Sequence, residues 1–192
     1  MAMTEVLAIG GSAGSLPVIT GILDALPTGF NYAVIIVLHR LKNVFSEMDK
    51  VLVNYRTDLK IKEPEDKEPV RKHHIYLAPQ NYHLLVEEEK TFSLDYSELV
   101  NHSRPSIDVT FDSLAQAYGP LVTCILLSGA NRDGAAGLSK VIDRGGIGIV
   151  QDPETAEYTS MPLAAIQLNK KITIQTPEEI VNYIRTVNMR KK

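Results

Sequence analysis

The sequence predicts an α/β protein with a doubly wound, mostly parallel sheet flanked by helices. Several apolar runs rich in β-branched residues lack the alternation of a strand with one wet face. Such continuous runs are typical of parallel strands that helices cover on both faces. Segments with helical periodicity lie between these runs, and strands that alternate with helices form βαβ units.

The elements follow in order along the chain. Strands are predicted at residues 6–9, 32–38, 122–127 and 147–150, and helices at residues 16–26, 45–55, 107–118, 135–144 and 177–187. Two stretches depart from this rhythm. Residues 60–69 are charged and contain prolines, which predicts a surface loop. An apolar segment follows at residues 74–79. Residues 83–87 and 91–94 are expected to pair as a hairpin. We therefore expect one Rossmann-like domain, residues 1–192, with a short antiparallel hairpin insertion.

Composition excludes several classes of protein. The 192 residues are 44% hydrophobic and 22% charged, which is ordinary for a globular domain and excludes a disordered chain. Because 20 Lys and Arg face 23 Asp and Glu, no excess of positive charge favours nucleic acid or an anionic membrane surface. No window is apolar enough for a membrane span, and the first residues do not form a signal peptide. We expect a cytoplasmic protein that does not insert into membranes.

The first chemical candidate is the turn after the first strand. Residues 10–15 read GGSAGS, which matches the G-x-S-x-G pattern of a strand-to-helix turn that exposes a serine, here Ser12. Glycine-rich turns in this position also bind phosphates, or serve only as turns. On this motif alone, a nucleotide site and a plain turn together outweigh catalysis.

Two further candidates follow other strands. His39 comes directly after the apolar run at residues 32–38, and Asp133 lies in the small-residue loop after residues 122–127. Taken singly, His39 could be a solvated histidine, and Asp133 could cap the next helix. Because the carboxyl ends of parallel strands face one crevice, Ser12, His39 and Asp133 are predicted to meet there.

The remaining histidines and the cysteine show no pattern of a site. His73, His74, His83 and His102 lack the spacing of metal ligands, so we predict no metal and no cofactor. Cys124 lies within an apolar strand and is interpreted as a buried hydrophobe. Residues 104–108, RPSID, are predicted to begin a helix, with Asp108 favoured in its first turn.

Six segments together resemble the catalytic domain of the CheB-type chemoreceptor protein-glutamate methylesterases. They are residues 8–14, 38–39, 76–87, 104–108, 127–137 and 151–166. The resemblance implies a serine carboxyl-ester hydrolase that removes γ-methyl groups from receptor glutamates, releasing methanol, and that also deamidates receptor glutamines. It implies the cytoplasmic domains of methyl-accepting chemoreceptors as partners, with Ser12 as nucleophile, His39 as general base and Asp133 as its orienting group. Backbone N–H groups at Ala13 and Ala130 would form the oxyanion hole.

The chain departs from the family pattern in two places. The loop that usually reads T-G-M-G-x-D-G carries Ala130 in place of the methionine and Asn131 in place of the second glycine. The chain also starts at the first strand of the catalytic domain, without the receiver domain of the family's regulated members. Two other classes stay open: the altered loop favours a non-catalytic signalling module that retains the fold, and the turn at residues 10–15 favours a nucleotide-binding domain.

Overall fold

The computed structural model describes residues 5–39, 52, 59 and 61–187. Its strands are β1 (Val6–Gly11), β2 (Ala33–Leu38), β3 (Ile61–Lys62), β4 (Ile75–Leu77), β5 (His83–Val86), β6 (Phe92–Asp95), β7 (Val122–Leu126), β8 (Ile147–Gln151) and β9 (Thr173–Gln175). Its helices are α1 (Leu16–Ala25), α3 (Ile107–Tyr118), α4 (Ala135–Asp143), α5 (Ser160–Leu168) and α6 (Pro177–Val187), with short 3₁₀ turns at Gly119–Leu121 and Pro153–Thr155.

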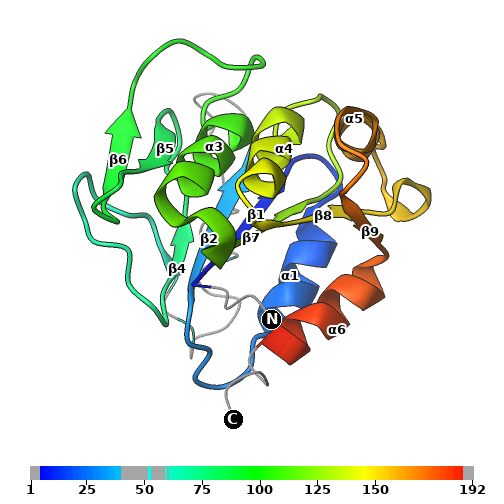
Figure 1. The fold of residues 1–192 in the computed structure, drawn as a ribbon, viewed down its shortest axis with the longest axis horizontal. Coiled ribbons are helices and arrows are strands. Elements are labelled where there is room, and N and C mark those ends of the chain that lie inside the picture. Colours follow the sequence, from blue (N-terminus) through cyan, green and yellow to red (C-terminus); the bar gives the residue numbers. More distant parts are fainter. Residues whose placement is uncertain (1–4, 40–51, 53–58, 60, 188–192) are drawn as a thin grey trace.

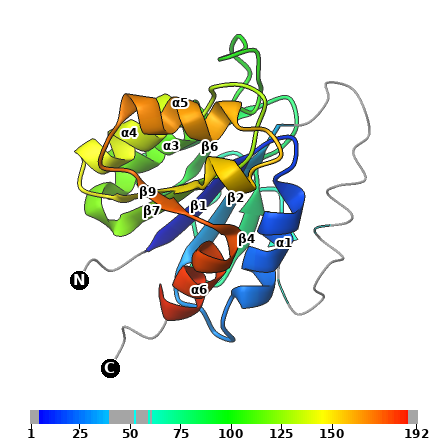
Figure 2. The ribbon, with the colours of Figure 1, turned by 90° about the vertical axis from the view of Figure 1, so that its right-hand side faces the viewer.

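The main sheet is parallel and covered on both faces. Its strand order is β3-β4-β2-β1-β7-β8-β9, and β5 pairs with β6 in a separate antiparallel hairpin. Helices α3, α4 and α5 lie on one face, and α1 and α6 lie on the other (Figures 1 and 2). The doubly wound α/β class predicted from the sequence is therefore confirmed.

Alternate residues of the central strands supply two cores. Val6 and Ala8 of β1 point into the core beneath α3 and α4, whereas Leu7 and Ile9 point into the core beneath α1 and α6. All four side chains are completely buried. Because both faces of each strand are apolar, the sequence shows a continuous apolar run in place of alternation.

Some elements differ from the sequence prediction. Ile75–Leu77 forms β4 and pairs in parallel with β2, so residues 74–79 continue the main sheet and do not belong to the insertion. Neither α5 nor the edge strand β9 was expected, since Thr173 and Ile174 are exposed and give no strand pattern. The predicted surface loop at 60–69 includes the two-residue strand β3. Apart from Leu52, the predicted helix at 45–55 lies outside the described residues.

The order of the strands brings three strand ends together at one edge of the sheet, where functional side chains could meet. β1 is central and pairs with β2 on one side and β7 on the other, so the carboxyl ends of these three strands are adjacent.

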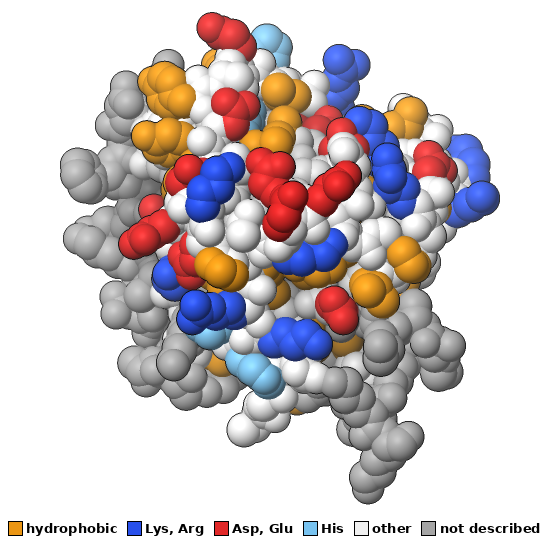
Figure 3. All heavy atoms as spheres, turned by 60° about the vertical axis from the view of Figure 1, so that its left-hand side comes forward, with side chains coloured by type: hydrophobic (Ala, Val, Ile, Leu, Met, Phe, Trp, Pro, Cys, Tyr) orange, Lys and Arg blue, Asp and Glu red, His pale blue; other side chains and the backbone are white. Residues whose placement is uncertain are grey.

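In the described part of the chain, no helix combines the length and the apolarity that crossing a membrane would require. On the side of the molecule that carries the β5–β6 hairpin, acidic and basic side chains are intermingled (Figure 3).

Candidate active site

The turn after β1 exposes Ser12. The Ser12 N–H donates to Ser128 O at 2.9 Å, and both the N–H and the hydroxyl of Ser15 donate to Ser12 O. Gly14 has φ of 77°, and a Cβ built there would lie 2.6 Å from Glu157 Cβ, so only glycine fits this position. The backbone is thereby held in a tight turn, and the Ser12 side chain is partly accessible.

His39 lies beside this turn. Leu38 is paired with Gly11 in the parallel register, and the His39 N–H donates to Gly11 O at 3.2 Å. The next residues along the two strands, Ser12 and His39, therefore occupy neighbouring strand ends. The His39 side chain is 11% exposed, and its Nε2 lies 2.7 Å from Asp133 Oδ2. An imidazole that is paired on one side and accessible on the other is suited to proton transfer.

Asp133 is fully buried and is the centre of a dense hydrogen-bond cluster. Its carboxylate accepts hydrogen bonds from His39 Nε2 (2.7 Å), Ser106 Oγ (2.8 Å), Ile107 N (2.6 Å), Asp108 N (3.2 Å) and Asn101 Nδ2 (3.1 Å). Burial alone would raise the pKa of Asp133, but the hydrogen bonds from His39, Asn101 and Ser106 hold that pKa below its usual value of 3.8. The group is an ionised acceptor at neutral pH.

This ionisation sets the tautomer of His39. A carboxylate can only accept, so Nε2 of His39 carries the proton that Asp133 receives, and in the neutral imidazole Nδ1 then offers a lone pair. In the neutral ring, Nδ1 is therefore the nitrogen that can accept a proton. Within the described residues, the structure shows no hydrogen bond between Ser12 Oγ and His39; Nδ1 instead forms a hydrogen bond with the hydroxyl of Ser103, at 3.3 Å.

Asp133 does not cap the helix that follows it, which was the alternative interpretation of its position. The residue before α4 is Gly134, with φ of 94° and no side-chain cap. The Asp133 carboxylate instead receives the first N–H groups of α3, where the positive end of the helix dipole stabilises an anion. The predicted helix start at residues 104–108 is confirmed, with Ser106 as its cap, and its first N–H groups bind this carboxylate.

The two predicted oxyanion donors lie in neighbouring turns. Ala13 and Ala130 are exposed, and neither N–H donates a hydrogen bond to another described residue. The buried Ser128 ties these turns together: its Oγ donates to Ala13 O at 2.8 Å and accepts from Tyr158 N at 2.9 Å. Ser128 was not singled out from the sequence, because its importance depends on contacts with two distant loops.

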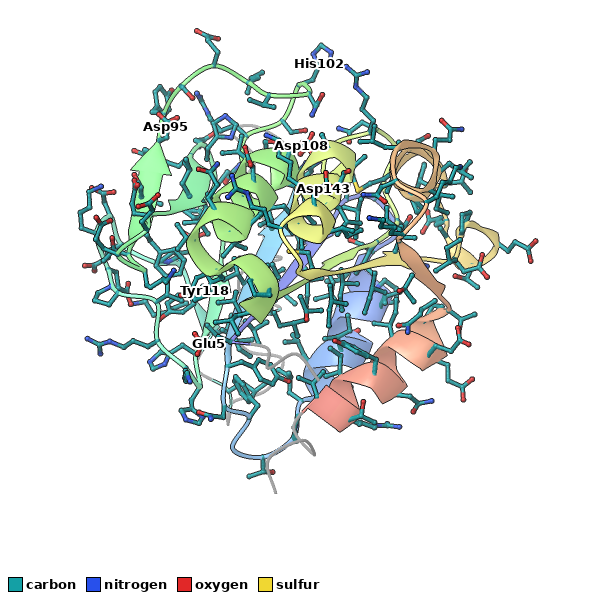
Figure 4. The ribbon with its side chains drawn as sticks, in the orientation of Figure 1. Glu5, Asp95, His102, Asp108, Tyr118 and Asp143 are labelled. Carbon is teal, nitrogen blue, oxygen red and sulfur yellow. The ribbon has the colours of Figure 1, made fainter. Side chains whose placement is uncertain are left out.

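Among the described residues, the remaining candidates make no hydrogen bond to Ser12 or His39. His83 is buried, with Nε2 on Glu98 O and Nδ1 accepting from Ser106 N, so it has a structural position. His102 points outward from the loop before α3, whereas Asp108 lies at the start of that helix (Figure 4). Burial raises the pKa of the Cys124 thiol well above its usual range. Among the described residues, no group of three His, Cys, Asp or Glu side chains is placed to hold a metal.

A cavity of about 480 Å³ adjoins the cluster. Its lining includes Asn101, which also donates to Asp133, and Arg132, which precedes Asp133 in the chain. Ala135 and Ala164 supply apolar wall. The cavity therefore meets the hydrogen-bond cluster of Asp133 on the side of Asn101 and Asp108, and neither Ser12 nor His39 lines it.

Together, the fold and the site define a class of protein: a doubly wound α/β domain with a buried imidazole–carboxylate pair next to an exposed serine turn, an arrangement found in serine esterases. Comparison with known proteins makes this class specific. The family model for the CheB methylesterase matches residues 7–184. This chain belongs to the CheB methylesterase family, whose named members are hydrolases.

Individual relatives support this assignment. A relative from Leptospira interrogans, named for protein-glutamate methylesterase and protein-glutamine glutaminase, is 42% identical over 92% of this chain and 91% of its own length. Relatives from Hahella chejuensis and Archaeoglobus fulgidus are 32% and 33% identical, and the chain spans about half their length (50% and 52%). The crystal structure of the Thermotoga maritima CheB methylesterase catalytic domain superposes with a TM-score of 0.83 at 28% identity, covering 95% of this chain and all of that one.

Proposed function

We propose that this chain hydrolyses the γ-methyl esters of glutamate side chains on the cytoplasmic domains of chemoreceptors, releasing methanol in the cytoplasm. The observation that carries the proposal is the 2.7 Å contact between His39 Nε2 and the buried Asp133, placed beside the Ser12 turn at the carboxyl edge of the sheet. Family membership and the names of the relatives supply the reaction.

The mechanism follows from the positions of these groups. Ser12 Oγ attacks the ester carbonyl as its proton passes to His39 Nδ1, and Asp133 stabilises the resulting imidazolium through Nε2. The oxyanion accepts hydrogen bonds from the N–H groups of Ala13 and Ala130. Collapse of this intermediate returns the proton to methoxide, which leaves as methanol, and water then releases the glutamate from Ser12 by the same steps.

The same cluster can deamidate glutamine. An amide places its carbonyl against the same donors, and His39 gives its proton to the amide nitrogen, which leaves as ammonia in place of methanol. The relatives carry both activities in their names. The test is to incubate the full chain with a methylated receptor fragment and to follow each site by mass spectrometry. We expect loss of methyl groups and conversion of amides to acids; a fragment that stays fully methylated would contradict the proposal.

Two other functions were left open by the sequence. A nucleotide site in the Gly10–Ser15 turn is disfavoured because Glu157 Oε2 lies 2.9 Å from where a Gly14 Cβ would stand, so a carboxylate covers the turn and repels phosphate. A non-catalytic module predicts that Ser12 stays inert to a fluorophosphonate probe. Labelling of Ser12 would exclude it.

Removing the Ser128 hydroxyl should weaken catalysis by loosening the oxyanion donors. In Ser128→Ala, Ala13 O and Tyr158 N each lose a partner. We expect the free energy of unfolding to fall by about 1–3 kcal/mol and kcat to fall about 10- to 100-fold through misplaced donors. Ser128→Thr keeps the hydroxyl and is the matched control. Steady-state kinetics and urea unfolding measure both effects; full activity in Ser128→Ala would show that the two turns hold their positions without this link.

A further inference from the structure

The hydroxyl of Ser103 forms a hydrogen bond with His39 Nδ1, the atom that receives the Ser12 proton in the proposed mechanism. Ser103 Oγ is 3.3 Å from His39 Nδ1. Because Nδ1 is the unprotonated nitrogen, the serine hydroxyl is the donor in this hydrogen bond. Ser12 needs the same lone pair for its activation. The hydroxyls of Ser12 and Ser103 therefore compete for His39 Nδ1 as hydrogen-bond acceptor. In this structure the Ser103 hydroxyl occupies it.

Ser103 is held in place by its own turn. The backbones of Val100 and Ser103 exchange hydrogen bonds of 3.2 and 2.9 Å across a two-residue turn. Asn101 and His102 in that turn have φ of 49° and 62°, which is the pattern of a tight turn with two left-handed residues. Such a turn restricts the backbone that carries the Ser103 side chain.

A second contact orients the Ser103 hydroxyl. Asn131 Nδ2 donates to Ser103 Oγ at 3.3 Å, while Asn131 Oδ1 accepts from Asp133 N at 3.0 Å. The donation from Asn131 occupies a lone pair of Ser103 and leaves the hydroxyl hydrogen for an acceptor. The family pattern places glycine at position 131, and glycine has no side chain that could make this contact. The contact between Asn131 and Ser103 therefore arises from the departure of this loop from the family pattern.

The hydroxyl hydrogen has a second acceptor within reach. Asn101 O lies 3.4 Å from Ser103 Oγ, close to the 3.3 Å distance to His39 Nδ1. Rotation about the Cβ–Oγ bond moves the hydrogen from Nδ1 to Asn101 O without moving the backbone. A change in one torsion angle of Ser103 therefore breaks its hydrogen bond to His39 Nδ1 and leaves that nitrogen available to Ser12.

We infer that Ser103 is a positioning residue that holds His39 in a resting state by competing with Ser12 for Nδ1. The inference rests on the proposed function, since it assigns the base to His39. Asp133 already orients the ring through Nε2, so the imidazole does not need Ser103 for its alignment. The Ser103 hydrogen bond must be given up before Ser12 transfers its proton, which raises the barrier to the first step.

The test measures how fast a fluorophosphonate labels Ser12 in the full chain. In this reaction the Ser12 Oγ–P bond forms, the P–F bond breaks, fluoride leaves and the Ser12 proton goes to His39. Ser103→Ala should label about three- to tenfold faster than the wild type, which is the effect of one neutral hydrogen bond. Ser103→Thr keeps the hydroxyl and should label at the wild-type rate. Ser97→Ala is the control, since Ser97 is an exposed serine on the same loop whose hydroxyl donates to Asp95.

A spectroscopic signal reports the hydrogen bond independently of the chemistry. In protein with ¹⁵N-labelled histidine, the Nδ1 resonance of His39 should move towards that of an unbonded nitrogen in Ser103→Ala and stay unchanged in Ser103→Thr. Labelling of Ser103→Ala that is no faster, faster labelling also in Ser103→Thr, or an unmoved Nδ1 resonance would each overturn the inference. A wild type that does not label at Ser12 would instead contradict the proposed function, while the resonance still tests the Ser103 contact.

Discussion

Replacing Ser12 with alanine should abolish methyl-ester hydrolysis while leaving the fold intact. The Ser12 side chain makes no hydrogen bond with the described residues; the turn is held by the backbone of Ser12 and by Ser15. Loss of the nucleophile should therefore reduce kcat by a factor on the order of 10⁴ or more, with only binding and the oxyanion donors left to act.

Methanol release from a methylated receptor fragment measures this effect, and thermal unfolding checks the fold. Ser97→Ala is the control, since it removes an exposed hydroxyl of the same kind. Retention of a tenth of the wild-type rate in Ser12→Ala would assign the nucleophile to another residue. Ser103 would be the first candidate, because its hydroxyl lies against His39 Nδ1.

Asp133→Asn should lower both activity and stability. An amide cannot accept from all the donors that converge on Asp133, and its own NH₂ group faces N–H groups of α3. It also permits the wrong tautomer of His39, so we expect kcat to fall by a factor on the order of 10⁴. The unpaired donors should reduce the free energy of unfolding by about 2–4 kcal/mol.

The matched control is Asp143→Asn, the same chemical change at an exposed carboxylate near the end of α4 (Figure 4). It should leave activity unchanged and stability within about 0.5 kcal/mol of the wild type. Kinetics and urea unfolding of both variants measure the difference. Equal stability of the two variants would show that the donors around Asp133 find other partners.

The dependence of stability on pH provides a further check on Asp133. Its pKa in the folded chain is lowered from the usual 3.8, so the folded state binds the Asp133 proton more weakly than the unfolded state does. The stabilisation is therefore complete above the unfolded value and is lost as the pH falls through the folded one. Acid unfolding followed by circular dichroism should show a smaller loss of stability below pH 3.8 in Asp133→Asn than in the wild type. Parallel losses in the two proteins would contradict this.

Much of the fold could be predicted from the sequence because it depends on local pattern. The apolar runs that became β1, β2 and β7 are continuous, and the helices between them have clear periodicity. The edge strand β9 was missed because it has three residues, of which Thr173 and Ile174 are exposed, so burial leaves little pattern there. In α5 only Met161, Pro162 and Ala165 are buried, which gives a weak helical pattern. Residues 75–77 have the composition of a buried strand, but only pairing with β2 assigns them to the parallel sheet.

The candidate site could be predicted in part. Ser12, His39 and Asp133 could be selected because each follows a predicted strand, and parallel strands bring their carboxyl ends to one edge. The structure joins His39 to Asp133 and places Ser12 at the neighbouring strand end; their catalytic roles stay predictions. Ser106 and Asn101 gave no signal of contact with Asp133, because each lies about 30 residues away in sequence and reaches it only through packing of the loop before α3 (separations of 27 and 32 residues).

By itself, the sequence determined the class of fold and the three strand ends at which chemistry could occur, because hydrophobic periodicity and glycine-rich turns act over a few neighbouring residues. Tertiary structure alone decided which atoms meet. Asp133 reaches His39 across 94 residues and binds the start of α3, not the start of its own helix. It thereby leaves Nδ1 of a neutral His39 as a hydrogen-bond acceptor, and the turn that carries Ser103 places a hydroxyl 3.3 Å from that nitrogen. Such contacts depend on how distant segments pack, and short-range sequence patterns do not predict that packing.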